Sequence, residues 1–496
     1  MKLSQLLKGI PVKEVKGSKE LEITGICSNS KLIAPGNLFV ARKGIMADGS
    51  QYIPEAIASG AVAIVTDLYD PLTPKHITQI IHSDPAEIEG LLAAHYYQRA
   101  SDEMYMVGLT GTNGKTTTSF LITHLFNQTA GLCGLIGTIE YIIGKTRYKA
   151  TRTTPDVCST HKLLREMRLQ GCQSAVAEVT SHALDQGRVD QVDFDVALFT
   201  NLTLDHLDYH HTMEEYAKAK QKLFLSLDPT KRKMGLPFPK TAIVNADSPW
   251  SDFMLQGCKA ETLTYGMMGN PDLKATEVVL SPSGTHLTMT YKEERISAFS
   301  PFVGRFNVYN YLAAVAVGLA RQLPLKTIVE ALATATPPPG RLDKVDNPLG
   351  LKIYVDFAHS DDALLNVLTC LNEFKTGRII VVFGCGGNRD ASKRPKMGRV
   401  CEEHADVVII TSDNPRNESP EAIIDEIKKG LKHPERACVK LDRKEAIEQA
   451  ISIATPDDLI LIAGKGHETY QIFGHKTIEF DDKQVALELC QNRVFA

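Results

Sequence analysis

The chain has neither a long hydrophobic run nor a large excess of charge of one sign. No apolar stretch approaches the length that spans a bilayer, and the short one within residues 1–10 is interrupted by Lys8. The net charge is −4, which disfavours a dominant role in nucleic-acid binding. We therefore expect a cytoplasmic protein with no membrane span and no nucleic-acid partner.

The ten cysteines of the chain form no Cys-x-x-Cys pair. They are dispersed over 496 residues, which favours reduced, mostly packed thiols over a disulfide framework. Hydrophobic residues make up 43% of the chain and charged residues 23%, as is ordinary for a folded enzyme. The composition indicates a large globular protein.

At 496 residues the chain exceeds what one hydrophobic core usually supports. Residues 334–340 read Thr-Ala-Thr-Pro-Pro-Pro-Gly, and the three prolines deny the preceding helix any continuation. A domain boundary is expected there. We predict three domains, over residues 1–100, 101–336 and 337–496.

Each predicted domain combines strands and helices. In the first, strand-like runs at 38–41 and 62–65 and one helical pattern at 54–59 predict a small α/β domain. In the other two, apolar strands alternate with helical stretches, which predicts mostly parallel sheets with ligands at the carboxyl ends of the strands. The third domain is expected to be Rossmann-like. The strands are predicted at 106–110, 132–136, 174–179, 196–200, 242–245, 353–356, 379–383, 407–411 and 459–463.

Residues 110–118 read Thr-Gly-Thr-Asn-Gly-Lys-Thr-Thr-Thr, between an apolar run and a helical segment at 119–126. This pattern predicts a phosphate-binding loop, although Leu109 stands where the common form has glycine. Lys115 can reach terminal phosphates and Thr116 can offer its hydroxyl to Mg²⁺. A plain turn before a helix would explain the glycines but not the Lys-Thr pair. We expect a nucleoside triphosphate to contact Gly111, Thr112, Asn113, Gly114, Lys115, Thr116 and Thr117.

Acids and imidazoles follow two other strands of the central domain. Glu178 ends one strand, and its carboxylate suits Mg²⁺. His206 follows another strand and could complete a second metal site. Taken singly, His182, His206 and His210 are each better explained as capping or packed residues, and their joint position at strand ends shifts the balance modestly towards a site.

A predicted helix at 216–224 carries Lys218, Lys220 and Lys222. A lysine near bound metal and phosphate could have a lowered pKa and be chemically modified. Helix spacing alone does not choose among the three.

Three polar loops follow strands of the third domain. Residues 384–390 form a glycine-rich turn, which alone is weak support for a ligand site. Asp413-Asn414-Pro415-Arg416 is typical of a turn, yet Arg416 offers a carboxylate clamp beside an acceptor for an ammonium. Residues 464–468 add a second acceptor, Glu468. Together the loops predict an amino-acid site.

These motifs together resemble the Mur ligases, ATP-dependent enzymes that add amino acids to UDP-N-acetylmuramate in peptidoglycan synthesis. The resemblance covers nearly the whole chain and includes the shortened phosphate loop. It is strongest to the branch that adds meso-diaminopimelate, because residues 413–416 match the signature of that amino acid.

The resemblance implies a role for each matching position. It makes Lys115, Glu178, His206 and Lys220 the catalytic set, and Thr116, Glu178, His206 and carbamylated Lys220 the Mg²⁺ ligands. It adds Asn307, Asn310, Arg341 and Asp356 to the ATP site. For the UDP-muramoyl substrate it implies residues 35–39 and 47–49 with Ser30, Thr153, Thr154, Thr180, Gln186 and Arg188. For diaminopimelate it implies Arg389, Asp413, Asn414, Pro415, Arg416, Gly464 and Glu468.

The chain departs from the family pattern at several positions. The usual Asp-Ser-Arg is Asn29-Ser30-Lys31, which lacks a carboxylate and a guanidinium fork. Thr180 replaces a common serine and Arg152 replaces an asparagine. Residues 356–361 read Asp-Phe-Ala-His-Ser-Asp in place of Asp-Tyr-Ala-His-Thr-Pro.

The implied reaction joins meso-diaminopimelate to UDP-N-acetylmuramoyl-L-alanyl-D-glutamate through an acyl phosphate, in a monomer. An L-lysine-adding Mur ligase is disfavoured by the Arg416 clamp, and a folate polyglutamylating ligase by the first domain. A phosphate-loop switch or motor ATPase would need no amino-acid pocket, and the guanine-specific Asn-Lys-x-Asp element is absent. A catalytically inactive nucleotide-binding regulator is disfavoured because the triphosphate, metal and amino-acid elements are all present.

Overall fold

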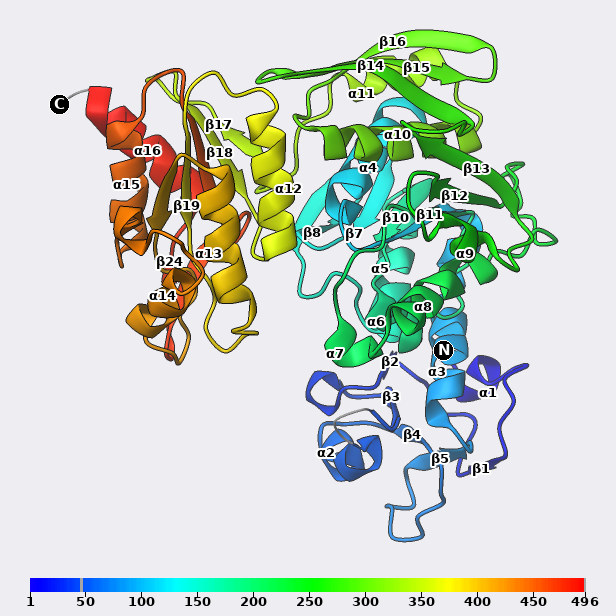
Figure 1. Ribbon diagram of the computed structural model, residues 1–496. Helices are drawn as coiled ribbons and strands as arrows, with labels where there is room; N and C mark the ends of the chain where they lie inside the picture. The colour runs from blue at the N-terminus through cyan, green and yellow to red at the C-terminus, as the bar shows by residue number, and fades with distance from the viewer. Residues whose placement is uncertain (45–47, 495–496) are drawn as a thin grey trace. The chain divides into compact units, whose positions relative to one another are not determined.

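The computed structural model describes residues 1–44 and 48–494 (Figure 1). Ala47, which the family resemblance assigns to the UDP-muramoyl substrate, lies outside the described residues. The chain forms two compact units, residues 1–272 with 313–328 and residues 273–312 with 329–496. The two units contain three main sheets, and parallel strands form the centre of each sheet. The predicted α/β class is therefore confirmed.

The N-terminal sheet has the strand order β1-β5-β4-β3-β2. Strands β2 to β5 pair in parallel, and only β1 is antiparallel. The predicted strands and helix are confirmed as β3, β4 and α2. The strands are β1 (Glu14–Lys16), β2 (Gly25–Cys27), β3 (Asn37–Val40), β4 (Ala63–Thr66) and β5 (Thr78–Ile81), with helices α1 (Leu3–Leu6), α2 (Ile53–Ala58) and α3 (Pro85–Tyr96).

Besides the predicted helical segment, this domain contains helices α1 and α3, which were not anticipated. Helix α3 is the longer of the two. Asp84 caps its N-terminus by accepting a hydrogen bond from the Ala86 amide at 3.0 Å, and Pro85 occupies the first turn. An Asp-Pro pair is a helix start signal. The helix packs against α5 (Val157–Leu169), which joins the N-terminal sheet to the central one within this unit.

The central sheet of the first unit runs β13-β12-β11-β6-β10-β7-β8-β9. It is parallel from β13 to β7, and all five predicted strands are present. The antiparallel strands β8 and β9 at its edge were not anticipated. The strands are β6 (Tyr105–Thr110), β7 (Cys133–Ile136), β8 (Glu140–Ile143), β9 (Thr146–Lys149), β10 (Ser174–Glu178), β11 (Val196–Phe199), β12 (Thr241–Asn245) and β13 (Glu261–Gly266).

Helices cover this sheet and bring side chains to its carboxyl edge. Helix α4 packs on β7 and β10, and α8 packs on β6. The short helices α6, α7 and α9 follow strands β10, β11 and β12 respectively. The helices are α4 (Lys115–Thr129), α6 (Ser181–Asp185), α7 (Leu207–His210), α8 (Met213–Leu225) and α9 (Ser251–Leu255).

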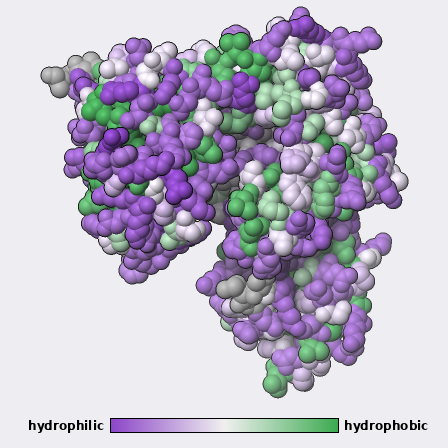
Figure 2. Space-filling view, viewed as in Figure 1, coloured by the Kyte–Doolittle hydropathy of each residue, from purple (hydrophilic) through white to green (hydrophobic). Residues whose placement is uncertain are grey.

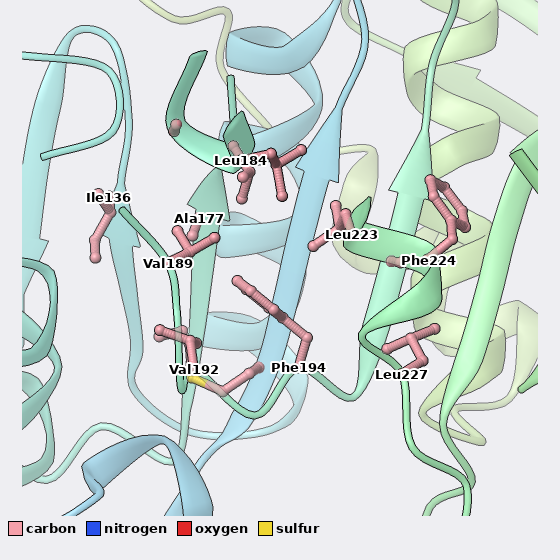
Figure 3. Close-up of a cluster of buried hydrophobic side chains, with 14 of the residues drawn as sticks. Ile136, Ala177, Leu184, Val189, Val192, Phe194, Leu223, Phe224 and Leu227 are labelled. Carbon is pink, nitrogen blue, oxygen red and sulfur yellow. The ribbon is translucent and has the colours of Figure 1, made fainter. Parts of the chain in front are cut away.

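A glycine in β6 allows α8 to pack closely on the sheet. A Cβ atom at Gly108 would lie 2.9 Å from the Phe194 ring and 3.0 Å from Leu223. Figure 3 shows both side chains in the buried cluster, with Phe224 beside Leu223 on the same helix. Since β6 leads into the phosphate loop, this contact sets the distance between that loop and the side chains of α8.

The second unit contains a three-stranded antiparallel element that the sequence did not predict. Polar residues interrupt the apolar residues of each of its strands, so that none forms a continuous apolar run. They are β14 (Leu273–Ser281), β15 (Gly284–Tyr291) and β16 (Glu294–Ser300), followed by α10 (Arg305–Ala320) and α11 (Leu325–Leu332). Helix α10 begins in the second unit and ends in the first.

The C-terminal sheet has the order β17-β18-β22-β19-β20-β21 and is parallel except for β17. The predicted doubly wound pattern is therefore confirmed, with all four predicted strands. The strands are β17 (Asp343–Val345), β18 (Lys352–Asp356), β19 (Ile379–Phe383), β20 (Val407–Ile410), β21 (Cys438–Val439) and β22 (Leu459–Ala463). Five helices and a hairpin complete it, namely α12 (Asp361–Asn372), α13 (Lys393–His404), α14 (Pro420–Lys428), α15 (Arg443–Ile453), α16 (Asp482–Val494), β23 (Tyr470–Phe473) and β24 (Lys476–Glu479).

All ten cysteines have free thiols and seven of them are buried, as expected for packed cysteines. Within residues 1–44 and 48–494, no helix has both the length and the apolar character needed to cross a membrane. The face shown in Figure 2 is mostly hydrophilic, with hydrophobic residues in small separate patches.

Candidate functional site

The phosphate loop turns sharply between β6 and α4 because two glycines adopt backbone conformations that other residues avoid. Gly111 has φ +151° and Gly114 has φ +87°. A Cβ atom at Gly111 would also collide with the Thr200 hydroxyl. The loop therefore needs glycine at this position for steric as well as conformational reasons.

Asn201, which follows β11, holds the first half of the loop. The Thr112 amide donates to the Asn201 carbonyl and the Asn113 amide to its side-chain oxygen, each at 2.9 Å. These two amides are occupied by protein groups. Anion binding is therefore left to the amides in the first turn of α4, where the helix N-terminus adds positive field.

Lys115 lies back along the loop that precedes it. Its ammonium donates to the carbonyl oxygens of Gly111 and Thr112, both at 2.9 Å. The ammonium of Lys115 therefore lies against the phosphate loop. A terminal phosphate bound there would compete with these two carbonyl oxygens for the ammonium.

Glu178 is fully buried and accepts four hydrogen bonds. Thr116 donates at 3.1 Å and Ser119 at 3.2 Å, while Thr138 donates through its amide at 3.0 Å and its hydroxyl at 2.8 Å. The sequence reading missed Ser119 and Thr138, because neither lies in the phosphate-loop pattern. The carboxylate is therefore held rigidly next to Thr116.

Oxygen atoms from Thr116 and Glu178 meet at this point, and such a donor set fits Mg²⁺. In the part of the chain that the structure describes, no cluster of three or more His, Cys, Asp or Glu side chains is arranged to hold a metal. Mg²⁺ that is bound together with nucleotide phosphates usually takes only part of its coordination shell from protein ligands.

His206 belongs to a group of aromatic rings beside the loop. It has φ +55° at the start of α7, and its ring lies 5.0 Å from His182 and 5.9 Å from Tyr216. Burial lowers the pKa of His206, and burial together with the neighbouring His206 lowers the pKa of His182 to about 4. Both rings are therefore neutral at neutral pH.

His210 completes this group from the end of α7. Its Nε2 pairs with the Ser181 hydroxyl at 2.9 Å, and its ring stacks on Tyr216 at 5.2 Å. It is thus a packed histidine that links α6, α7 and α8.

The structure separates the three lysines of α8. Lys220 is 1% exposed, donates to the Gly111 carbonyl at 3.0 Å and lies 4.5 Å from the centre of the Tyr216 ring. Burial, and secondarily the charge of Lys115, holds the pKa of Lys220 well below its usual range. Lys218 and Lys222 are half-exposed or more and pair with Glu215 and Asp185.

The residues that the resemblance assigns to the muramoyl peptide form a connected network in the first unit. Thr154 donates to the Glu178 carbonyl at 2.7 Å and accepts from the Thr180 amide at 3.2 Å. Arg188 donates to the Thr154 carbonyl at 3.1 Å and to Gln186 at 2.7 Å. Burial lowers the pKa of Arg188, and the charge of Arg152 adds to this effect.

Two further residues of that set are engaged elsewhere in the same unit. The Thr153 hydroxyl lies 3.1 Å from that of Thr138, which in turn contacts Glu178. Ser30 lies in the N-terminal sheet region and donates to Glu55 at 2.8 Å.

The remaining nucleotide candidates lie in the second unit. Asn310 donates to the Asn307 side chain at 2.8 Å, and Asn307 donates to the Val303 carbonyl at 2.7 Å. Asp356 accepts from the amides of Leu342 and Ala358. Burial raises the pKa of Asp356, against the opposing effect of Arg341.

Three loops of the C-terminal sheet converge on Asp413, Arg416 and Glu468. Arg416 has φ +54° and donates to the Gly387 carbonyl at 2.8 Å, which joins it to the glycine-rich turn. Asn414 donates to Glu468 at 2.9 Å. A Cβ atom at Gly464 would lie 2.8 Å from an oxygen of Asp413. The structure therefore brings together the loops that the sequence predicted as an amino-acid site.

Arg389 and Pro415 belong to the same loops. Arg389 donates to the Asn388 carbonyl at 3.2 Å. A Cβ atom at Gly387 would collide with the Pro415 carbonyl, so glycine allows the two loops to touch. The sequence reading missed Lys465, a fully buried lysine between Gly464 and Gly466.

The chain matches three family models, described as the Mur ligase family catalytic domain (residues 22–97), the Mur ligase middle domain (109–318) and the Mur ligase glutamate ligase domain (340–466). The chain belongs to the Mur ligase family. It is accordingly an ATP-dependent enzyme that forms amide bonds.

Named relatives cover the full length of the chain. A UDP-N-acetylmuramoyl-L-alanyl-D-glutamate–2,6-diaminopimelate ligase from Chlamydia pneumoniae is 42% identical over 100% of both chains. The ligase of the same name from Caldanaerobacter subterraneus is 40% identical over 99% of both. A solved structure of a ligase of that name has a TM-score of 0.72 at 28% identity, covering 100% of this chain and 99% of its own.

Proposed function

We propose that this Mur ligase joins meso-diaminopimelate to the D-glutamyl γ-carboxylate of UDP-N-acetylmuramoyl-L-alanyl-D-glutamate in peptidoglycan precursor synthesis. Relatives named as UDP-N-acetylmuramoyl-L-alanyl-D-glutamate–2,6-diaminopimelate ligases match the whole chain at about 40% identity. The observation that carries the choice of amino acid is the convergence of Asp413, Asn414, Arg416 and Glu468 at one sheet edge.

In the first half of the reaction, the γ-carboxylate attacks the γ-phosphorus of ATP, forming an acyl phosphate and releasing ADP. Lys115 would neutralise charge on the transferring phosphoryl group, and the first turn of α4 would bind the phosphates. Thr116 and Glu178 would hold Mg²⁺, with His206 and carbamylated Lys220 as further ligands. When bound, Mg²⁺ supplies charge stabilisation at the phosphoryl oxygens.

The buried, uncharged state favoured for Lys220 suits carbamylation, because only the free amine adds to carbon dioxide. The product would be a carboxylate beside the phosphate loop. This supports Lys220, rather than Lys218 or Lys222, as the modified residue.

In the second half, the amine of diaminopimelate attacks the acyl phosphate and inorganic phosphate leaves. Arg416 would bind a carboxylate of the amino acid, while Asp413 and Glu468 would accept from its ammonium. We also assign nucleotide contacts to Asn307, Asn310, Arg341 and Asp356.

We assign UDP-muramoyl binding to residues 1–100, ATP binding to 101–336 and amino-acid binding to 337–496. Ser30 would serve the uridine end, and Thr153, Thr154, Thr180, Gln186 and Arg188 the muramoyl peptide. We expect a monomer that works in the cytoplasm on small-molecule substrates.

Phosphate release from ATP tests this function directly. The assay contains UDP-N-acetylmuramoyl-L-alanyl-D-glutamate and compares meso-diaminopimelate, L-lysine and no amino acid. Release that requires both substrates and favours diaminopimelate is the expected result. A preference for lysine would be consistent with a Mur ligase but would contradict the role of Arg416 in selecting diaminopimelate. Phosphate release that depends on neither substrate would indicate a phosphate-loop switch ATPase.

A further inference from the structure

The loop after β22 carries a buried cation that the proposed reaction does not use. Lys465 has a side chain with 0% exposure, although lysine is rarely buried without a specific partner. The glycines on both sides have positive φ, +113° at Gly464 and +52° at Gly466. This backbone turns the Lys465 side chain inward, away from solvent.

The partner of Lys465 is a residue of the proposed amino-acid site. Its ammonium donates to Oε2 of Glu468 at 3.1 Å and to Oδ1 of Asn414 at 3.4 Å. Asn414 also donates to Oε2 of Glu468, at 2.9 Å. The three side chains therefore form a closed triangle between the loops after β20 and β22.

Both contacts fall on the same carboxylate oxygen of Glu468. The Glu468 side chain is 21% exposed, whereas the side chain of Lys465 is fully buried. Held through Oε2, the carboxylate directs its other oxygen, Oε1, away from the triangle. A carboxylate fixed in this way is prepared to accept from an ammonium group with little loss of side-chain freedom.

We propose that Lys465 is a positioning residue that fixes the Glu468 carboxylate for the ammonium of the incoming amino acid. The inference rests on the proposed function. It adds a residue that acts on the amino acid through Glu468, its ion-pair partner.

The loop geometry explains why a lysine serves here. The ring of Tyr470 lies over the ammonium of Lys465, with the ring centre 5.4 Å from Nζ. The backbone amide of Ile472 donates a hydrogen bond to Oδ1 of Asn414 at 3.0 Å. A neutral side chain at position 465 would leave Glu468 with Asn414 alone. The carboxylate would then be free to rotate, and misplacement of an orienting group by about 1 Å can cost a hundredfold in rate.

The test is a double-mutant cycle on the full-length enzyme, using Lys465→Met, Glu468→Gln and the double variant. Each protein is assayed for kcat and for KM of diaminopimelate, ATP and the UDP-muramoyl substrate, together with its Tm. We expect Lys465→Met to raise the KM of diaminopimelate by about tenfold or more, with the other KM values changed less than about twofold. Lys465→Arg, which keeps the charge, is expected to recover part of the loss.

The double variant keeps the proposal testable if Lys465→Met is too unstable to study, because it removes both charges and leaves neither buried alone. We expect it to match Glu468→Gln in KM for diaminopimelate, since Lys465 acts through Glu468. Additive effects in the cycle, or an unchanged KM for diaminopimelate, would overturn the proposal.

A matched control separates positioning from general destabilisation. Lys233 is another buried lysine with a carboxylate partner, Asp195 at 2.6 Å, and it lies outside the proposed sites. Lys233→Met should lower Tm without a selective rise in the KM of diaminopimelate. If Lys465→Met behaves in the same way, Lys465 has only a structural role. Wild-type enzyme that does not depend on diaminopimelate would instead refute the proposed function itself.

Discussion

The side-chain Nζ of Lys220 donates a hydrogen bond of 3.0 Å to the carbonyl of Gly111, the first glycine of the phosphate loop. The two residues are 109 positions apart in the chain. Packing of α8 on β6 through Gly108 brings them together, so Lys220 is presented to the nucleotide site by a hydrophobic contact. The same packing buries Lys220 and lowers its pKa.

Replacement of Lys220 tests whether it carries the modified amine. We expect Lys220→Ala to reduce phosphate release by about a hundredfold, because a ligand for Mg²⁺ is lost. Small carboxylic acids added to the assay should restore part of the activity by supplying a carboxylate. Lys218→Ala, on the exposed face of the same helix, should change activity by less than about twofold. Full activity of Lys220→Ala would remove this lysine from the metal site.

Glu178→Gln tests the carboxylate at the centre of the site. Glutamine keeps the size of the side chain but loses the charge, and its amide cannot accept all four of the observed donors. Activity at saturating ATP should fall about a hundredfold, with a raised requirement for Mg²⁺ measured by titration of the metal.

Ser119→Ala is the control for that variant, because it removes one donor to Glu178 and leaves the charge. Its activity should fall by less than about tenfold. Equal losses in the two variants would mean that the hydrogen-bond network, and not the charge of Glu178, is what matters.

Arg416→Lys tests the carboxylate clamp. Lysine keeps the positive charge but lacks the planar fork, so we expect the KM of diaminopimelate to rise about tenfold while the KM of ATP is unchanged. Arg399→Lys, at an exposed position of α13, is the control and should leave both constants unchanged. An unaltered KM for diaminopimelate in Arg416→Lys would contradict the assignment.

His161 on α5 should make the stability of the protein sensitive to acid. Burial lowers the pKa of His161 from 6.5 to about 4, and its Nε2 pairs with the Asp190 carbonyl at 2.8 Å. The unfolded chain therefore binds a proton first, and stability falls as the pH decreases from about 6.5 towards about 4. Between about pH 7.5 and about pH 5 the loss should approach 2 kcal/mol, to order of magnitude.

Urea unfolding of the wild type and of His161→Gln at both pH values measures this contribution. Glutamine does not titrate and can still donate to the Asp190 carbonyl, while the other histidines are common to both proteins. The variant should lose less stability on acidification than the wild type. Identical losses would show that His161 does not titrate in this range.

Local sequence patterns were sufficient for the central parallel strands and the phosphate loop, but not for the parallel strands β2, β5, β13 and β21. Buried parallel strands such as β6 and β19 appear as continuous apolar runs, and Gly-Lys-Thr after such a run marks an anion-binding helix start. The antiparallel strands β14 to β16 were not predicted because polar residues interrupt their apolar residues and weaken the hydrophobic signal. The residue roles carried over from the family depended on motif matching and remain predictions.

Tertiary structure decided which members of each pattern meet. Helical spacing placed Lys218, Lys220 and Lys222 on one segment, but only the packing of α8 on β6 selects Lys220 for burial beside Gly111. Likewise the donors around Glu178 come from α4 and from the turn after β7, and Lys465 reaches Glu468 because two glycines turn it inward. Side-chain period reveals a face of an element, whereas contacts between distant segments depend on how those faces pack.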